Sequence, residues 1–185
     1  SVQTAITVKH VSKDDSGFTV ATDRGSFTAK SLVIATGGPS IPKMGATGFG
    51  YEIARQFGLK VINPRPGLVP LTFDATTMAA LTGLTGVSLD ATVRLDKIAF
   101  TEALLFTHRG LSGPVILQIS SYWRDGDKIV INLLSGIDPW QHLKEAKVQQ
   151  PRRETHTVLA QLMPRRLAQR MVDLTECGGR LSDIS

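Results

Sequence analysis

The sequence contains few of the residues that build metal sites and covalent cross-links. Its 185 residues include a single cysteine, Cys177, and four histidines scattered along the chain. One cysteine cannot form an internal disulfide, and without more cysteines or closely spaced histidines no zinc site is expected. We therefore predict that the chain binds no metal. We also expect no redox role for Cys177, because no histidine or lysine lies near it in the sequence to activate the thiol.

Long hydrophobic runs are also missing. No apolar stretch approaches the roughly 18 to 20 residues that a membrane-spanning helix needs, and the first twenty residues lack the apolar segment of a signal peptide. We therefore expect a cytoplasmic protein with no membrane partner. The chain opens at Ser1, without methionine and directly in strand-like sequence, so we expect it to be an internal fragment of a longer protein.

What is present is the composition of an ordinary globular protein, with 42% hydrophobic and 20% charged residues. The formal charge of +5 is spread thinly: residues 1–63 carry 7 basic and 4 acidic groups, 64–136 carry 6 and 6, and 137–185 carry 8 and 6. Proteins that bind nucleic acid usually concentrate basic residues on one face, so we expect no nucleic-acid partner. One basic cluster near the C-terminus is expected to be a solvated helical face rather than an anion site, which is the alternative; it comprises Arg152, Arg153, Arg165, Arg166 and Arg170.

The N-terminal third has the pattern of short strands followed by a buried one. Residues 4–30 alternate between apolar and polar side chains and are interrupted by turn sequences, which predicts a three-stranded antiparallel meander. Residues 31–35 are almost continuously apolar, which is typical of a strand buried on both faces of a parallel sheet. Gly37 and Gly38 follow directly, and glycines at the end of such a strand let the backbone approach a ligand closely.

The rest of the chain divides into a β-rich and a helical part. A helix is expected from about Gly48 to Phe57, capped by Thr47 and ended by Gly58. The string Asn63-Pro64-Arg65-Pro66-Gly67 marks a domain boundary. We predict a partial cofactor-binding domain in 1–63, a β-barrel-like domain in 64–136 and a helical part in 137–185. Strands are expected at 68–73, 87–95, 98–107 and 128–134, with one helix at 112–123 and helix breaks at the prolines 151 and 164.

Several strings resemble a known family of bacterial flavoproteins. They are Leu32 to Gly38, Gly48 to Tyr51, Gly67 to Leu71 and, most specifically, Leu105 to Pro114. Together they resemble the BaiN/YhiN-like FAD-dependent flavoprotein (NAD(P)/FAD-dependent oxidoreductase) family. This resemblance implies a mixed α and β fold: part of a glutathione-reductase-like FAD/NAD(P)-binding Rossmann domain, followed by an inserted translation-factor-like β-barrel and a helical subdomain. It also implies FAD as cofactor, with electrons passing between FAD and NAD(P)H or a small-molecule substrate.

A complete dinucleotide-binding domain is nevertheless absent from the sequence. The Gly-x-Gly-x-x-Gly fingerprint and the acidic residue about twenty positions later are both missing. We therefore expect the fragment alone to bind little or no FAD and to be inactive as an enzyme. The alternative hypothesis is a non-enzymatic module whose β-barrel binds a protein or RNA, and the neutral charge of 64–136 argues against RNA.

The resemblance also supplies candidate site residues. It places FAD contacts at six positions: Val8, Ala35, Thr36, Gly37, Gly48 and Gly50. For the last two, close packing of a helix is an alternative explanation. His108 and Arg109 are candidate catalytic residues, because an imidazole beside a guanidinium can recognise an anion or donate a proton. The alternative favoured by the sequence is that residues 108–114 form a structural turn and helix cap. Trp123 and Trp140 are expected to serve packing rather than stacking on a ligand.

Overall fold

The computed structural model describes residues 1–183 of the chain. It divides into two compact units, Ser1–Pro64 and Arg65–Ser185. Among the described residues, none of the helices is both long enough and apolar enough to cross a membrane.

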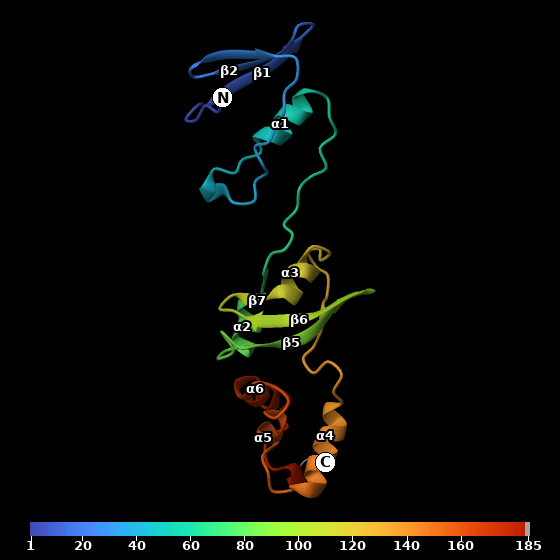
Figure 1. Cartoon of the computed structure of the whole chain (residues 1–185). Helices are drawn as coiled ribbons and strands as arrows, with labels where there is room; N and C mark the ends of the chain where they lie inside the picture. The colour runs from blue at the N-terminus through green and yellow to red at the C-terminus, as the bar shows by residue number, and fades with distance from the viewer. Residues whose placement is uncertain (184–185) are drawn as a thin grey trace. The chain divides into compact units, whose positions relative to one another are not determined.

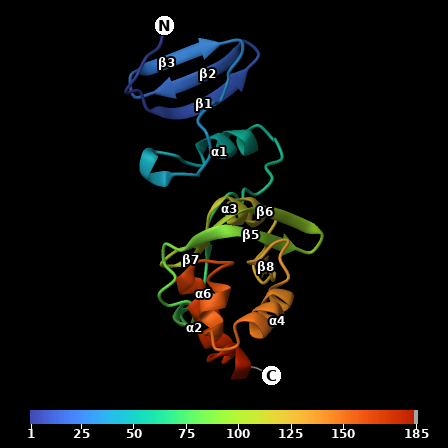
Figure 2. The ribbon, with the colours of Figure 1, turned by 60° about the horizontal axis from the view of Figure 1, so that its bottom comes forward.

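The first unit is built on the predicted meander. Strands β1 (Val8–Asp14), β2 (Gly17–Thr22) and β3 (Gly25–Ala29) pair antiparallel in chain order (Figure 2). Helix α1 (Phe49–Gln56) packs against them: the Phe18 and Phe57 rings meet edge to face at 5.8 Å, and the Gln56 side-chain amide donates to the Val11 carbonyl at 2.6 Å. These contacts hold helix and meander together, so a small core exists around Val11, which is 1% exposed.

The boundaries of α1 follow from its flanking residues. Gly48 is the N-cap residue, and the Thr47 hydroxyl accepts a hydrogen bond from the Phe49 amide at 3.4 Å. The last helical residue is Gln56 and Phe57 is the C-cap. The next residue, Gly58, has a positive φ of 74°, which residues with a side chain rarely adopt. The predicted helix is therefore confirmed, with the cap one residue later than Thr47.

The predicted buried strand at residues 31–35 is wrong. This segment forms no ladder, and Val33 is 85% exposed. A parallel strand needs hydrogen-bonding partners on its flanks, and the described part of the unit offers only the meander, whose strands pair with one another. The mixed α and β character is confirmed, but the Rossmann domain is not present in the described residues.

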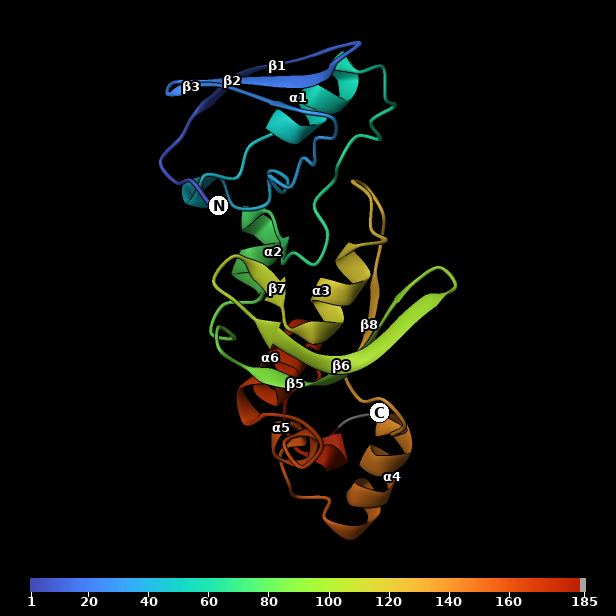
Figure 3. The same ribbon diagram turned by 45° about the horizontal axis from the view of Figure 1, so that its top comes forward.

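The second unit contains a curled antiparallel sheet with the strand order β4-β7-β6-β5-β8 (Figure 3). Its longest pair is the curved hairpin of β5 (Ser88–Leu95) and β6 (Ile98–Phe106). The short strands β4 (Leu71–Thr72), β7 (Gly110–Ser112) and β8 (Val130–Asn132) complete it. The two edge strands, β4 and β8, do not pair with each other, so the sheet is an open half-barrel.

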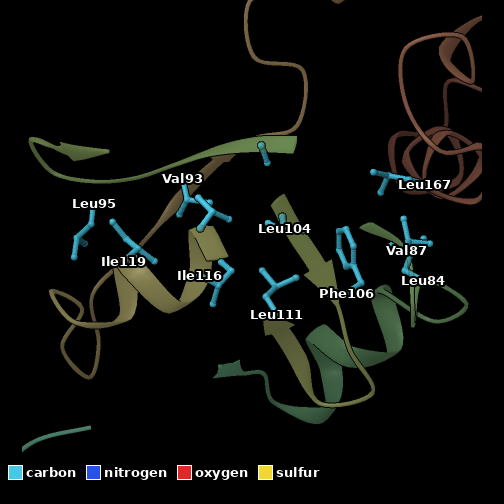
Figure 4. Close-up of a cluster of buried hydrophobic side chains, with 12 residues drawn as sticks. Leu84, Val87, Val93, Leu95, Leu104, Phe106, Leu111, Ile116, Ile119 and Leu167 are labelled. Atoms are coloured by element: carbon cyan, nitrogen blue, oxygen red, sulfur yellow. The ribbon is translucent and has the colours of Figure 1, made fainter. Parts of the chain in front are cut away.

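Helix α3 (Pro114–Ser120) packs against the hairpin β5–β6 and closes the core (Figure 1). Its Pro114 occupies the first turn, as predicted, because a missing N–H costs nothing there. The side chains of β5 alternate so that Ala91, Val93 and Leu95 point to the core while the residues between them are more exposed. The core cluster comprises Leu84, Val87, Ala91, Val93, Leu95, Leu104, Phe106, Leu111, Val115, Ile116, Ile119 and Leu167 (Figure 4).

The remaining helices are α2 (Ala75–Ala80), α4 (Pro139–Gln149), α5 (Thr155–Leu159) and α6 (Arg165–Thr175). The breaks between the last three fall at Pro151 and Pro164, as the sequence predicts. Leu167 of α6 is fully buried in the sheet's core, so the helical segment and the sheet share one hydrophobic interior.

Candidate functional site

The predicted cofactor residues of the first unit lie partly together. Ala35, Thr36 and Gly37 form an exposed, irregular segment that passes over the start of α1. A side chain at Gly50 would approach the Thr36 hydroxyl to 3.0 Å and the Ile34 side chain to 3.4 Å. Close packing of this segment on the helix therefore accounts for Gly50. Gly37 has a positive φ of 70° and open space around it.

The other two cofactor candidates have ordinary structural positions. Gly48 is the N-cap of α1, and a Cβ added there would meet no other atom within 4 Å. Val8 opens β1, pairs with Thr22 next to a register shift, and is 39% exposed. Nothing in these positions tests contact with FAD, so the six cofactor residues stay predictions.

His108 and Arg109 lie in the second unit, in the exposed turn between β6 and β7. The turn is held by its backbone: the Thr107 amide donates to the Gly110 carbonyl at 2.8 Å, and the Phe73 amide donates to the Arg109 carbonyl at 3.0 Å. Gly110 leaves no room for a side chain, because the Leu71 carbonyl lies against it. This geometry explains the string as a turn, while a catalytic role for His108 and Arg109 stays an untested prediction.

Folding brings three arginines together on the helical part. The segment 151–155 pairs with 179–182 through an isolated antiparallel bridge between Glu154 and Arg180. The Leu181 amide donates to the Arg153 carbonyl at 2.8 Å, and the Thr155 amide donates to the Gly179 carbonyl at 3.0 Å. The backbone thus fixes three exposed arginines on the same short pairing, and we call Arg152, Arg153 and Arg180 the arginine ridge.

The ridge is available for a ligand. Within residues 1–183, no hydrogen bond or ion pair involves the side chains of its three arginines. Glu154 lies opposite Arg180 in the bridge, but their side chains form no ion pair in the described structure. Guanidinium groups without protein partners are suited to phosphate groups, which guanidinium binds through paired N–H donors.

Two other arginines of the predicted cluster serve the fold instead. Arg170 of α6 donates from Nε to the Ala80 carbonyl at 2.7 Å, at the end of α2, and Arg166 donates to the Gly83 carbonyl at 3.0 Å. The first bond satisfies a carbonyl that the end of α2 leaves without a partner, and the second holds the loop that follows α2. The cluster that was expected to form a solvated helical face therefore divides: Arg166 and Arg170 bond to backbone carbonyls, whereas Arg152 and Arg153 are exposed and lie outside the helices.

A pocket of about 530 Å³ lies between the end of α3 and strand β4. Trp123, Phe73, Val69 and Pro70 supply apolar walls. Its other lining residues are Arg65, Pro66, Leu71, Thr72, Ser120, Arg124, Asp125, Asp127 and Ile129. Pockets in this size range bind small ligands when apolar walls are combined with a few placed polar groups.

Neither the arginine ridge nor the pocket can be predicted from the sequence. Arg180 is separated from Arg153 by two helices, and only backbone pairing brings them together. Arg65 and Trp123 likewise come from distant segments. Their only signal in the sequence is the residue type itself. Across residues 1–183, no group of three His, Cys, Asp or Glu side chains is arranged to hold a metal ion.

Comparison with known proteins gives a consistent result. The family model for the "HI0933-like protein barrel and H2TH domain" matches residues 65–184. A protein of Escherichia coli K12 named ribosomal RNA dihydrouridine synthase is 43% identical over 179 residues, covering 96% of this chain and 44% of that protein. A Haemophilus influenzae Rd protein of the same name is 41% identical over 157 residues, covering 84% of this chain and 39% of that protein. The chain thus spans less than half the length of these relatives.

These findings correct three expectations from the sequence. The BaiN/YhiN-like flavoprotein assignment is wrong, because the matching family is defined by a barrel and an H2TH domain and the relatives are named for ribosomal RNA. The FAD-dependent oxidoreductase function is overturned by the same names, and the alternative of an RNA-binding barrel module fits better.

The third correction concerns partners. The expectation of no nucleic-acid partner is contradicted by relatives that are named for acting on ribosomal RNA. Counting charges along the chain misleads here because folding gathers Arg152, Arg153 and Arg180 into one place. Because the family model matches more than half of its length, the chain belongs to the HI0933-like family, with its barrel and H2TH domain in residues 65–184.

Proposed function

We propose that this chain supplies the RNA-binding part of a protein that forms dihydrouridine in ribosomal RNA. The observation that carries the proposal is the 43% identity, over 96% of the chain, to a protein named for that reaction. Because the chain spans less than half of that relative, the reaction as a whole is assigned to the longer protein.

The chemistry explains why such a protein needs a dedicated RNA-binding part. Forming dihydrouridine saturates the C5–C6 bond of a uracil ring, which takes up a hydride and a proton. The target base must leave its stack before any reacting group can reach that bond. Holding the surrounding RNA in place offsets the cost of unstacking, so contacts remote from the reacting base contribute to the rate.

The arginine ridge is the surface that we assign to the RNA backbone. Its three arginines are exposed, lie on one short backbone pairing and have no side-chain partners among residues 1–183. Phosphate contacts of this kind supply most of the affinity of a nucleic-acid-binding surface without reading sequence. The ridge lies within the segment matched by the barrel and H2TH family model, which further supports this assignment.

The reductant is not assigned to residues of this chain. FAD was expected from the sequence, yet Ala35, Thr36 and Gly37 form an open, exposed segment rather than a phosphate-binding turn at a helix start. These residues do not make a complete cradle for a dinucleotide.

The test is the dihydrouridine content of ribosomal RNA. Deleting the gene that encodes the longer protein should remove dihydrouridine from ribosomal RNA, measured by mass spectrometry of nuclease digests. Reintroducing the intact gene should restore it, while a copy with the exposed Arg152, Arg153 and Arg180 replaced by alanine should restore less. Unchanged dihydrouridine after deletion would overturn the proposal.

A further inference from the structure

The pocket between α3 and β4 has aromatic and charged lining residues that the proposed function leaves without a role. Arg65 and Asp125 are exposed at it, and Trp123 and Phe73 are half-buried in its wall. It thus combines aromatic surface with one positive and one negative side chain that are free of partners within residues 1–183.

The pocket is held open by hydrogen bonds on both sides. The buried Ser120 hydroxyl accepts from the Val69 amide at 2.9 Å and donates to the Leu117 carbonyl at 2.8 Å. This ties the segment leading to β4 onto α3. The indole N–H of Trp123 donates to the Asp127 carbonyl at 2.9 Å, which fixes the orientation of the ring.

The loop that follows α3 and lines the pocket is also held by hydrogen bonds. The Arg124 guanidinium donates to the carbonyls of Trp123 and Tyr122 at 2.7 and 2.9 Å, and the Arg124 amide donates to the Asp127 carboxylate at 2.8 Å. These carbonyls belong to the loop that follows α3 and its C-cap, Ser121. Because the loop is ordered by its own bonds, a ligand would find the pocket already formed, which lowers the cost of binding.

We propose that this pocket binds one unpaired base of the RNA, with the base stacked on Trp123. The inference rests on the proposed function, since it presumes RNA as the ligand. A volume of about 530 Å³ lies within the range of small-ligand pockets and accommodates a base with its sugar. Proteins recognise single-stranded RNA by stacking unpaired bases on aromatic side chains.

The two charged side chains match the two ends of a nucleotide. The Asp125 carboxylate can accept a hydrogen bond from an N–H on the edge of a base, and the Arg65 guanidinium can bind the adjoining phosphate. A base paired in a duplex has its edge occupied and its faces stacked. The pocket therefore selects unpaired RNA, whereas the arginine ridge binds any phosphate backbone.

The fluorescence of Trp123 provides a direct readout. The chain contains two tryptophans, 123 and 140, and Trp140 does not line the pocket. Two variants of the full-length protein, Trp140→Phe and Trp123→Phe, are titrated with a single-stranded oligouridylate that carries a fluorescent label. Anisotropy of the label reports binding, and tryptophan emission of an unlabelled parallel sample reports stacking.

We expect oligouridylate to quench Trp140→Phe and to quench Trp123→Phe much less, while both variants bind. The same RNA annealed to oligoadenylate should leave the emission of Trp140→Phe unchanged. Equal quenching in the two variants, with binding intact, would overturn the pocket assignment and leave the proposed function standing. Failure of both variants and of the wild type to bind any RNA would count against the proposed function itself.

A second pair of variants tests the pocket with exposed side chains, whose removal should not disturb the fold. Arg65→Ala removes an exposed side chain of the pocket, and Arg94→Ala removes an exposed arginine of β5 that does not line it. We expect Arg65→Ala to weaken binding of single-stranded oligouridylate by about tenfold, the loss of one charge-assisted phosphate contact. Arg94→Ala should leave it unchanged, and equal effects of the two variants would refute a specific pocket.

Discussion

Neutralising the arginine ridge should change the salt dependence of RNA binding by a calculable amount. The variant replaces Arg152, Arg153 and Arg180 with alanine. Each guanidinium that neutralises one phosphate contributes about −0.7 for single strands, or about −0.9 for a duplex, to the slope of log affinity against log salt concentration. Three lost contacts should therefore make the slope shallower by about 2 to 3.

The effect is largest at low salt. Between 50 and 200 mM salt, a slope change of that size alters the ratio of wild-type to variant affinity by roughly 15- to 65-fold. The assay is anisotropy of a labelled ribosomal RNA fragment, titrated with the full-length protein at several KCl concentrations. Because the three side chains are exposed and without partners in residues 1–183, the melting temperature should not change.

The matched control removes positive charge elsewhere on the same unit. Arg94 and Lys97 are exposed on the hairpin β5–β6, and the double alanine variant should leave the slope within about one unit of wild type. An unchanged slope in the ridge variant would refute the assignment. So would an equal loss in the control, because the charge would then act through the whole surface rather than through the ridge.

Four further changes test other parts of the structure. Glu154→Gln removes the carboxylate opposite Arg180 and should strengthen RNA binding at low salt, seen in the same titration. Leu104→Ala opens a cavity in the core and should lower the free energy of unfolding by about 3 kcal/mol in urea denaturation, whereas Val130→Ala, at an exposed side chain, should cost far less. Gly113→Ala should also destabilise the fold, because its φ is 92° and a side chain would come within 2.6 Å of the Ala103 carbonyl. The hydrogen bond from the Thr77 amide lowers the pKa of Asp74, so the loss of melting temperature in Asp74→Ala should appear at neutral pH; it should disappear as the pH falls below 3.8 and through the lowered pKa.

Local sequence signals predicted much of the secondary structure. The alternation and turns of residues 8–29 gave the meander, and Gly58 marked the end of α1 by its positive φ. Pro151 and Pro164 marked helix breaks, because proline lacks the donor that would continue a helix. In each case the determining interaction lies within a few residues along the chain.

The errors arose where distant segments decide the outcome. Residues 31–35 have the composition of a buried strand, but a strand exists only where partners pair with it. The arginine ridge depends on pairing between 151–155 and 179–182, which charge counts along the sequence do not contain. By residue type alone Arg65 and Trp123 do not stand out, and only the tertiary structure places both at one pocket.

The bonds from α6 to α2 have a consequence for experiments that scan basic residues. Arg166 and Arg170 each bond to two backbone carbonyls, and Arg170 does so with two different nitrogens of its guanidinium group. Lysine has no such fork of donors and is therefore a poor replacement at Arg170, although it keeps the charge. Alanine at either position would loosen the helix that inserts Leu167 into the core. A mutational scan that measures only the loss of RNA affinity would therefore mistake Arg166 and Arg170, which stabilise the fold, for RNA contacts. Measuring the melting temperature of each variant avoids this error.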